Sequence, residues 1–139
     1  MYETAFSLAG LAAMSGWALL LVAPAIPKWS DRMAGTVLPL IMSGGYVVLV
    51  LMPSEGSGGF GSLTQVMELF STEQAMLAGW VHYLAFDLFI GAWACRTARA
   101  EGVPHWLVLP CLPLIFLFGP AGLLAFQAVR RVRRTHSQA

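Results

Sequence analysis

The stretch from Gly79 to Phe89 reads GWVHYLAFDLF and places a histidine and an aspartate in otherwise apolar sequence. Around it, from about Ala75 to Cys95, the side chain of Asp87 is the only acidic one, and no lysine or arginine occurs. An apolar run of this length can cross the ~30 Å hydrocarbon core of a bilayer as a helix. The stretch therefore predicts a transmembrane helix that carries polar groups at membrane depth.

Three further apolar runs of similar length surround this one. We expect an all-α membrane protein, a compact bundle of four transmembrane helices that forms a single domain over residues 1–139. Prolines at 110, 113 and 120 predict that the last helix is kinked. The expected helices cover residues 4–26, 34–52, 75–95 and 104–129.

The overall composition supports a membrane protein. Hydrophobic residues make up 58% of the chain and charged residues 11%, whereas an average soluble domain is about 45–50% apolar and about 25% charged. A net charge of +1 gives no reason to expect binding to nucleic acid. Cys95 and Cys111 lie within or beside apolar runs, so we expect free, buried thiols.

The charges around the predicted helices leave the orientation open. Residues 28–32 form a short polar turn after the first helix. If the chain crosses four times, both termini and the loop of residues 53–73 share one side. That side then carries the four arginines between Arg130 and Arg134, against Lys28, Arg32, Arg96 and Arg99 on the other. The count of four against four does not decide the orientation, although the compact C-terminal cluster favours cytoplasmic termini.

A cleaved signal peptide has basic residues before its apolar stretch, and the first helix of this chain has none. We expect a multi-pass protein of the bacterial inner membrane.

The loop of residues 53–73 is the one long connection. It begins with a glycine-rich run and continues into Leu63, Val66, Met67 and Phe70, whose spacing predicts a short amphipathic helix at the membrane interface. The glycines do not match a phosphate-binding loop, because no Lys-Ser/Thr pair follows them. We interpret them as a hinge, and hypothesise that the loop gates a site in the membrane with Glu68 at its entrance.

The third helix presents two different polar faces. Asp87 and His82 are five residues apart, which is roughly 140° of rotation and roughly 7.5 Å of rise. Tyr83 and Trp80 share a side with Asp87, whereas Phe86 shares a side with His82. An ionised carboxylate at membrane depth costs about 2.5–3.5 kcal/mol, so such residues face the bundle and often have a function. Simple interhelical hydrogen bonds would also explain His82 and Asp87.

We expect no metal and no cofactor. The available ligands lack the spacing of a helical metal motif such as His-Glu-x-x-His. They are His82, Asp87, His105, Glu68 and, at a distance, Cys111.

Two motifs carry a resemblance to a known family. The stretch from Trp80 to Phe89 and the sequence FLFGPAGLL from Phe116 to Leu124 resemble the plant neoxanthin synthase-like (abscisic acid deficient four-like) membrane proteins. Those proteins carry a related Trp-x-His-x-x-Ala-x-Asp-Leu-Phe stretch, and the number and order of the predicted helices also agree.

The resemblance implies a carotenoid or another isoprenoid lipid as substrate, bound within the membrane. The plant activity converts the epoxide violaxanthin into the allene neoxanthin, an isomerisation that needs an acid at the epoxide oxygen and a base at a neighbouring proton. Asp87, assisted by Tyr83, fits the acid, and His82 would be the base only if the helix bends or the substrate wraps around it. The remaining candidates are substrate-binding residues, namely Trp80, Phe86, Glu68 and Phe118.

Two hypotheses stay open at this point. The first is a carotenoid-modifying enzyme, such as an isomerase. The second is a non-enzymatic pigment-binding or lipid-binding protein, or an accessory subunit that positions the substrate of another enzyme. A transporter is less favoured, because four helices rarely form a pathway without oligomerising. Whether the chain forms a homo-oligomer is also open.

Overall fold

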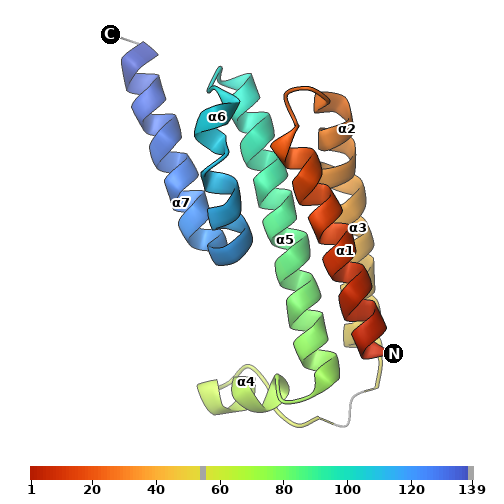
Figure 1. The fold of residues 1–139 in the computed structure, drawn as a ribbon. Helices are drawn as coiled ribbons and strands as arrows, with labels where there is room; N and C mark the ends of the chain where they lie inside the picture. The colour runs from red at the N-terminus through yellow and green to blue at the C-terminus, as the bar shows by residue number, and fades with distance from the viewer. Residues whose placement is uncertain (54–55, 138–139) are drawn as a thin grey trace.

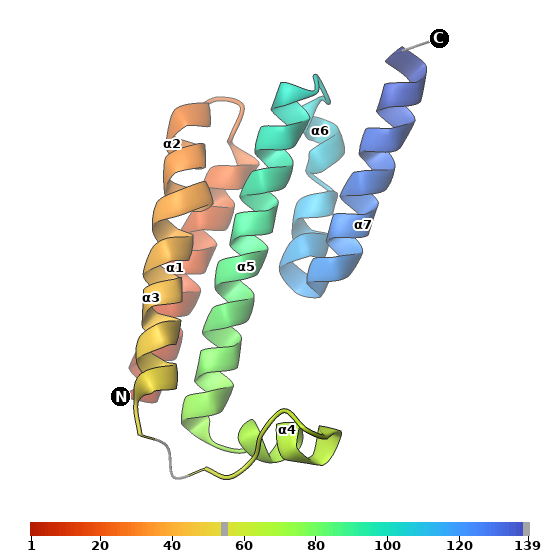
Figure 2. The ribbon, with the colours of Figure 1, turned by 180° about the vertical axis from the view of Figure 1, so that it is seen from behind.

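The long helices lie side by side along one direction. The computed structural model describes residues 1–53 and 56–137, with side chains up to Thr135. Within this part of the chain the secondary structure is helical and no strand occurs. Four helices are long and apolar enough to span a membrane, covering Tyr2–Leu21, Pro27–Leu51, Glu73–Ala100 and Cys111–Thr135, and Figures 1 and 2 show their arrangement. The predicted all-α class with four long apolar helices is confirmed.

Helix α5 (Glu73–Ala100) forms the centre of the bundle. It packs against α1 (Tyr2–Leu21), α3 (Leu38–Leu51) and α7 (Cys111–Ser137). The side chain of Thr72 accepts a hydrogen bond from the backbone N–H of Ala75 and so caps its first turn. The helix continues for a turn beyond the predicted end at residue 95. The third of the four long helices therefore lies at the centre of the bundle.

The polar turn predicted at residues 28–32 is instead a helix. Helix α2 (Pro27–Arg32) runs through the π-helical segment η1 (Met33–Val37) into α3. Proline is compatible with the first position of a helix, because the N–H that it lacks would be unpaired there anyway. Asp31 of α2 forms an ion pair with Arg99 near the end of α5, with an N–O distance of 2.6 Å.

The fourth long helix folds back on itself. After the short α6 (His105–Val108), α7 is interrupted at Phe118 and Gly119, whose backbone angles are not helical. The two halves lie against each other, since a Cβ on Gly122 would run into the backbone of Ile115. Helix α7 is therefore a hairpin that reaches about halfway along α5 (Figures 1 and 2). The sequence predicted a kink, and the structure has a full reversal.

This reversal corrects the expected position of the C-terminus. The Tyr2 hydroxyl donates to Gln74 at the start of α5, so the N-terminus lies at that end. Glu101, which follows the last residue of α5, is bound by Arg130 and Arg134 of α7. The two termini therefore lie at opposite ends of the bundle (Figure 1), whereas four simple crossings would place them together.

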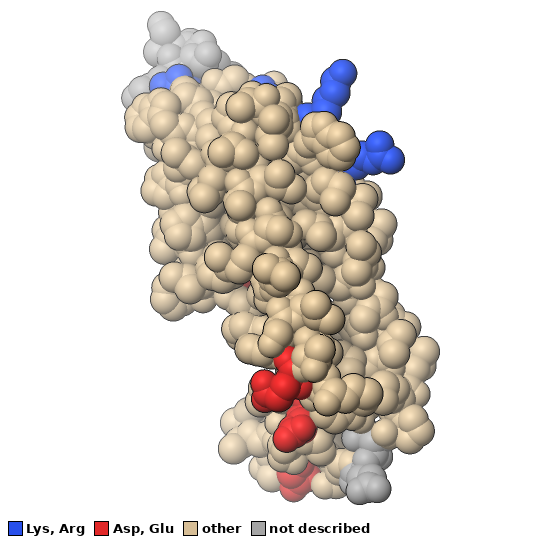
Figure 3. Space-filling view, turned by 45° about the vertical axis from the view of Figure 1, so that its right-hand side comes forward, with Lys and Arg blue, Asp and Glu red and all other residues tan. Residues whose placement is uncertain are grey.

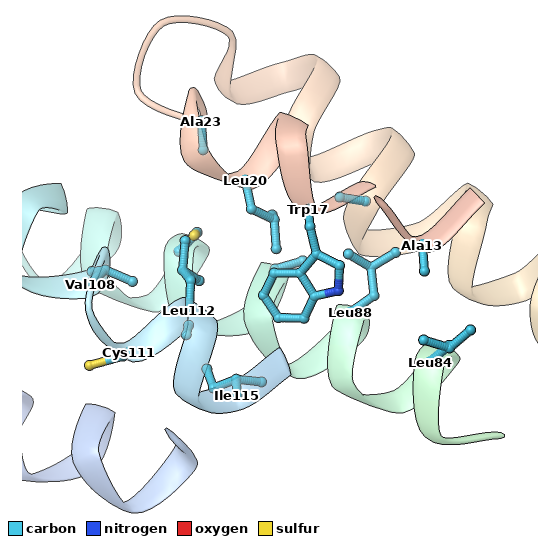
Figure 4. Close-up of a cluster of buried hydrophobic side chains, with 14 of the residues drawn as sticks. Ala13, Trp17, Leu20, Ala23, Leu84, Leu88, Val108, Cys111, Leu112 and Ile115 are labelled. Carbon is cyan, nitrogen blue, oxygen red and sulfur yellow. The ribbon is translucent and has the colours of Figure 1, made fainter. Parts of the chain in front are cut away.

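The buried core lies between α1, α5 and the first half of α7. Figure 4 shows Trp17, Leu20, Leu88, Leu112 and Ile115 pointing toward one another. Small residues allow these helices to approach closely. A Cβ on Gly16 would meet Leu88, and a Cβ on Gly91 would meet Trp17 and Leu20, in each case within 3 Å.

Small residues such as Ser43, Gly44 and Gly45 on α3 predict close packing of helices, but this prediction is wrong for the two glycines. A Cβ on either Gly44 or Gly45 would meet nothing within 4 Å. Both glycines are exposed. The tight approach uses Gly16 on α1, which makes room for Leu88, and Gly91 on α5, which makes room for Trp17 and Leu20.

The connection before α5 contains a short helix, α4 (Leu63–Leu69), within the segment where one was predicted. The Ser62 side chain caps it by accepting from the N–H of Gln65. Glu55 of the preceding glycine-rich run lies outside the described residues. Helix α4 lies across the end of the bundle where the N-terminus is found (Figure 2).

Candidate functional site

Asp87 lies at the middle of α5, where the hairpin of α7 turns. Its side chain is buried, with 7% of the residue exposed. The Asp87 carboxyl lies so close to Gly119 that a Cβ on this glycine would be 2.7 Å from Oδ1. Oδ2 has no hydrogen-bond partner within the described residues. The structure therefore presents one buried carboxyl against the break in a neighbouring helix.

Tyr83 lies one turn before Asp87 on the same face of α5. Its hydroxyl donates to the backbone carbonyl of Phe116, at the end of the first half of α7. The hydroxyl is also near enough to the Asp87 carboxyl to interact with it. A broken helix leaves carbonyl groups unpaired, and at membrane depth each must find a partner inside the protein. Tyr83 thus supplies a donor where the hairpin needs one.

The second half of α7 begins beside the same carboxyl. Gly119 and Pro120 form its start, and the first N–H groups of a helix favour a negative charge nearby. The carbonyl end of one half-helix and the N–H end of the other consequently meet at Asp87 and Tyr83. Proline is acceptable at this position for the same reason as at any helix start.

Aromatic rings border the site. Trp80 packs against Tyr83 with ring centroids 5.4 Å apart and stacks on Phe6 of α1 at 5.7 Å. Trp17 meets the ring of Phe116 edge to face at 5.4 Å. The indole N–H of Trp17 is buried without a hydrogen-bond partner in the described part of the chain. Trp80, predicted to bind substrate, therefore lies beside Tyr83.

His82 lies on a different face of α5. Its ring stacks on Phe86 with centroids 4.6 Å apart and contacts Tyr46 of α3 at 5.5 Å. It borders a cavity of about 440 Å³ that Phe60, Phe70 and residues of α3 and α5 also line. Helix α5 is regular throughout, so His82 does not approach the Asp87 carboxyl by a bend.

The other predicted substrate-binding residues are spread out. Phe86 lines a cavity of about 490 Å³ on the α3 side, together with Phe89 and Arg96. Phe118 lies at the turn of the hairpin next to Gly119 and is 62% exposed. Glu68 is exposed on α4, at the end of the bundle.

Two residues of the site were not predicted as site residues. Phe116 and Gly119 both belong to the FLFGPAGLL stretch from Phe116 to Leu124, which was singled out only through the family resemblance. A Gly-Pro pair inside an apolar run is a signal for a break, but it does not say which side chain the break will face. Among the described residues no group of three or more His, Cys, Asp or Glu side chains could hold a metal ion.

The comparison with known families agrees with the motifs in α5 and α7. The ABA DEFICIENT 4-like (ABA4-like) family matches residues 4–126, which include both motifs and the whole site described above. The chain belongs to the ABA4-like family. No curated protein and no solved structure matches the chain.

The family match and the four long apolar helices support a membrane protein. The suspected resemblance is confirmed.

Proposed function

We propose that this ABA4-like protein binds a carotenoid or a related isoprenoid lipid and isomerises it, with Asp87 as the acid. The observation that carries the proposal is the buried Asp87 carboxyl at the break of α7, with Oδ2 unpaired in the described part of the chain. A carboxyl at membrane depth is rare and is usually retained for a function.

Asp87 is proposed to be protonated in the resting protein. An ionised carboxylate buried without a cation is unfavourable. The lysines and arginines of the chain lie well away from Asp87 in sequence, the nearest being Arg96 on α5. Arg96 packs against Gly35 and the ring of Phe89 instead.

The reaction would conserve all atoms of the substrate. Asp87 gives its proton to an epoxide oxygen while the carbon–oxygen bond breaks. The resulting carboxylate removes a proton from the neighbouring vinyl carbon, so that an allene and a hydroxyl form and Asp87 regains its proton. The start of the second half of α7 would stabilise the transient carboxylate. This scheme needs no second base, which fits the position of His82 on another face.

Tyr83 is proposed to position Asp87 and the hairpin. Its hydroxyl already donates to the carbonyl of Phe116, so it is not free to act as a second acid without opening the turn. Trp80 and Phe118 would contact the apolar part of the substrate on either side.

The test is expression in bacteria that synthesise epoxidised carotenoids, followed by pigment analysis. We expect a new isomer with the unaltered protein and none with Asp87→Asn, which keeps the shape and a hydrogen-bond donor but cannot transfer a proton. Tyr83→Phe should retain part of the activity, and His82→Gln most of it. Unchanged activity in Asp87→Asn would refute the mechanism.

The alternative is a non-enzymatic pigment-binding or lipid-binding protein. A groove of about 430 Å³ between α1 and α3, lined almost entirely by apolar side chains, favours it. In that case unmodified pigment would copurify with the unaltered protein and equally with Asp87→Asn. We further propose the bacterial inner membrane as the location.

A further inference from the structure

All eight lysines and arginines of the chain lie at one end of the bundle. Helix α2 is tied to the end of α5 by the ion pair between Asp31 and Arg99. The second half of α7 returns to the same end, where Arg130 and Arg134 bind Glu101. The cationic end is thus defined by Lys28, Arg32, Arg96, Arg99, Arg130, Arg131, Arg133 and Arg134.

The opposite end has the reverse character. Glu3 lies at the start of α1, Glu73 at the start of α5, and Glu68 on α4. On the face shown in Figure 3, blue side chains gather at one end and red ones toward the other. At the acidic end no lysine or arginine occurs, because all eight belong to the cationic end.

Two carboxylates neutralise only part of the cationic end. Asp31 pairs with Arg99, and Glu101 is shared by two arginines of α7. The other five cations form no ion pair within the described residues, and most of them are exposed. This end therefore keeps a strong positive charge.

We infer that the chain inserts with the cationic end at the cytoplasmic face, against anionic lipid head groups. The N-terminus and α4 then lie on the opposite side of the membrane. Lysine and arginine near the ends of membrane helices are retained on the cytoplasmic side, where anionic lipids and the membrane potential favour them. Four crossings would divide these cations equally, whereas the hairpin of α7 brings them together. The inference does not depend on the proposed isomerase activity.

Labelling of single cysteines in intact bacteria tests the orientation. Ser57→Cys reports on the acidic end and Thr135→Cys on the cationic end, with the unaltered chain as the control for its two buried thiols. We expect a membrane-impermeant maleimide to label Ser57→Cys in intact cells, and Thr135→Cys only after permeabilisation. Labelling of both in intact cells would show that α7 crosses the membrane, and labelling of Thr135→Cys alone would show the reverse orientation; either overturns the inference.

A second pair of variants tests the cause. Replacing Lys28, Arg32, Arg131 and Arg133 with glutamine should give a mixed population, with several-fold more labelling of Thr135→Cys in intact cells. The matched control replaces Glu3 and Glu73 with glutamine and should change nothing, because acidic residues contribute little to orientation. An unchanged orientation in the variant with four glutamines would show that the positive charges do not determine the orientation.

Discussion

At the scale of single residues, the environment of Asp87 depends on the absence of a side chain at Gly119. The carboxyl occupies the space that a Cβ would take. Glycine at this position also tolerates the backbone conformation of the turn, which is far from helical. A carboxyl, a glycine and a phenol thus form one unit, although they come from two helices.

Gly119→Ala should therefore damage the site. The added Cβ would be 2.7 Å from Oδ1 of Asp87, so either the carboxyl or the turn must move. We expect pigment conversion to fall at least tenfold and the melting temperature in detergent to drop by several degrees. Gly10→Ala is the control, since a Cβ there meets nothing within 4 Å. Equal activity in both variants would contradict the assigned geometry.

The protonation state of Asp87 is a separate prediction. Infrared difference spectra should contain a protonated-carboxyl band at neutral pH that disappears in Asp87→Asn. The reason is the cost of a buried charge without a cation. Absence of this band in the unaltered protein would mean an ionised carboxylate, and the proposed acid would fail.

At the scale of elements, the hairpin of α7 is held at its open end by Glu101. Hydrogen bonds from Arg130, together with Arg134, lower the pKa of Glu101 from its ordinary 4.5 to about 2. A carboxylate with a lowered pKa contributes stability above its ordinary pKa and loses it as the pH falls through the lowered value. The contact should accordingly be complete at pH 5 and lost as the pH falls toward 2.

Glu101→Gln should loosen the second half of α7 at neutral pH. We expect faster hydrogen exchange in residues 120–135 and little change in α1 or α5, because one carboxylate binds both arginines. Asp31→Asn provides the control, since its ion pair joins α2 to α5 and does not involve α7. Equal exchange in the two variants would show that Glu101 does not hold the hairpin.

The glycine-rich loop remains a proposed gate. Gly58 has a φ of +119°, and a Cβ there would run into the backbone of Leu69. An alanine at this position would disturb the fold of the loop as well as its motion. Gly59→Ala, where the nearest atom is 3.3 Å away at the end of the Gln65 side chain, is the better test of gating by ligand-exchange kinetics.

At the scale of the whole molecule, the protein is apolar both inside and on its lateral surface. Leu112 is fully buried, whereas Leu40 is 66% exposed. Lipid tails are as apolar as the protein core, so the hydrophobic effect does not favour one of these leucines over the other. The two side chains differ only in how well they pack against neighbouring residues. We expect Leu112→Ala to lower the free energy of unfolding by about 2–5 kcal/mol and Leu40→Ala to leave it nearly unchanged, as measured by chemical denaturation in detergent micelles. Equal losses would argue against the observed core.

The sequence by itself determined the class of the molecule. Long apolar runs with few charges have no stable alternative to membrane helices, so the four helices and the short helix before α5 were predictable. The pairing of Asp87 with Tyr83 was also predictable, because a spacing of four residues sets a shared face on any helix.

Only the tertiary structure decided how the last helix runs. Three prolines indicate an irregular helix, but a kink and a reversal break the same local hydrogen bonds, and distant contacts choose between them. Those contacts are the hydrogen bond from Tyr83 to Phe116, the carboxyl of Asp87 against Gly119, and the arginines on Glu101. The reversal in turn gathers the eight cations at one end of the bundle. The count of charges along the sequence did not decide the orientation, and the inferred orientation therefore depends on a turn that the local sequence does not specify.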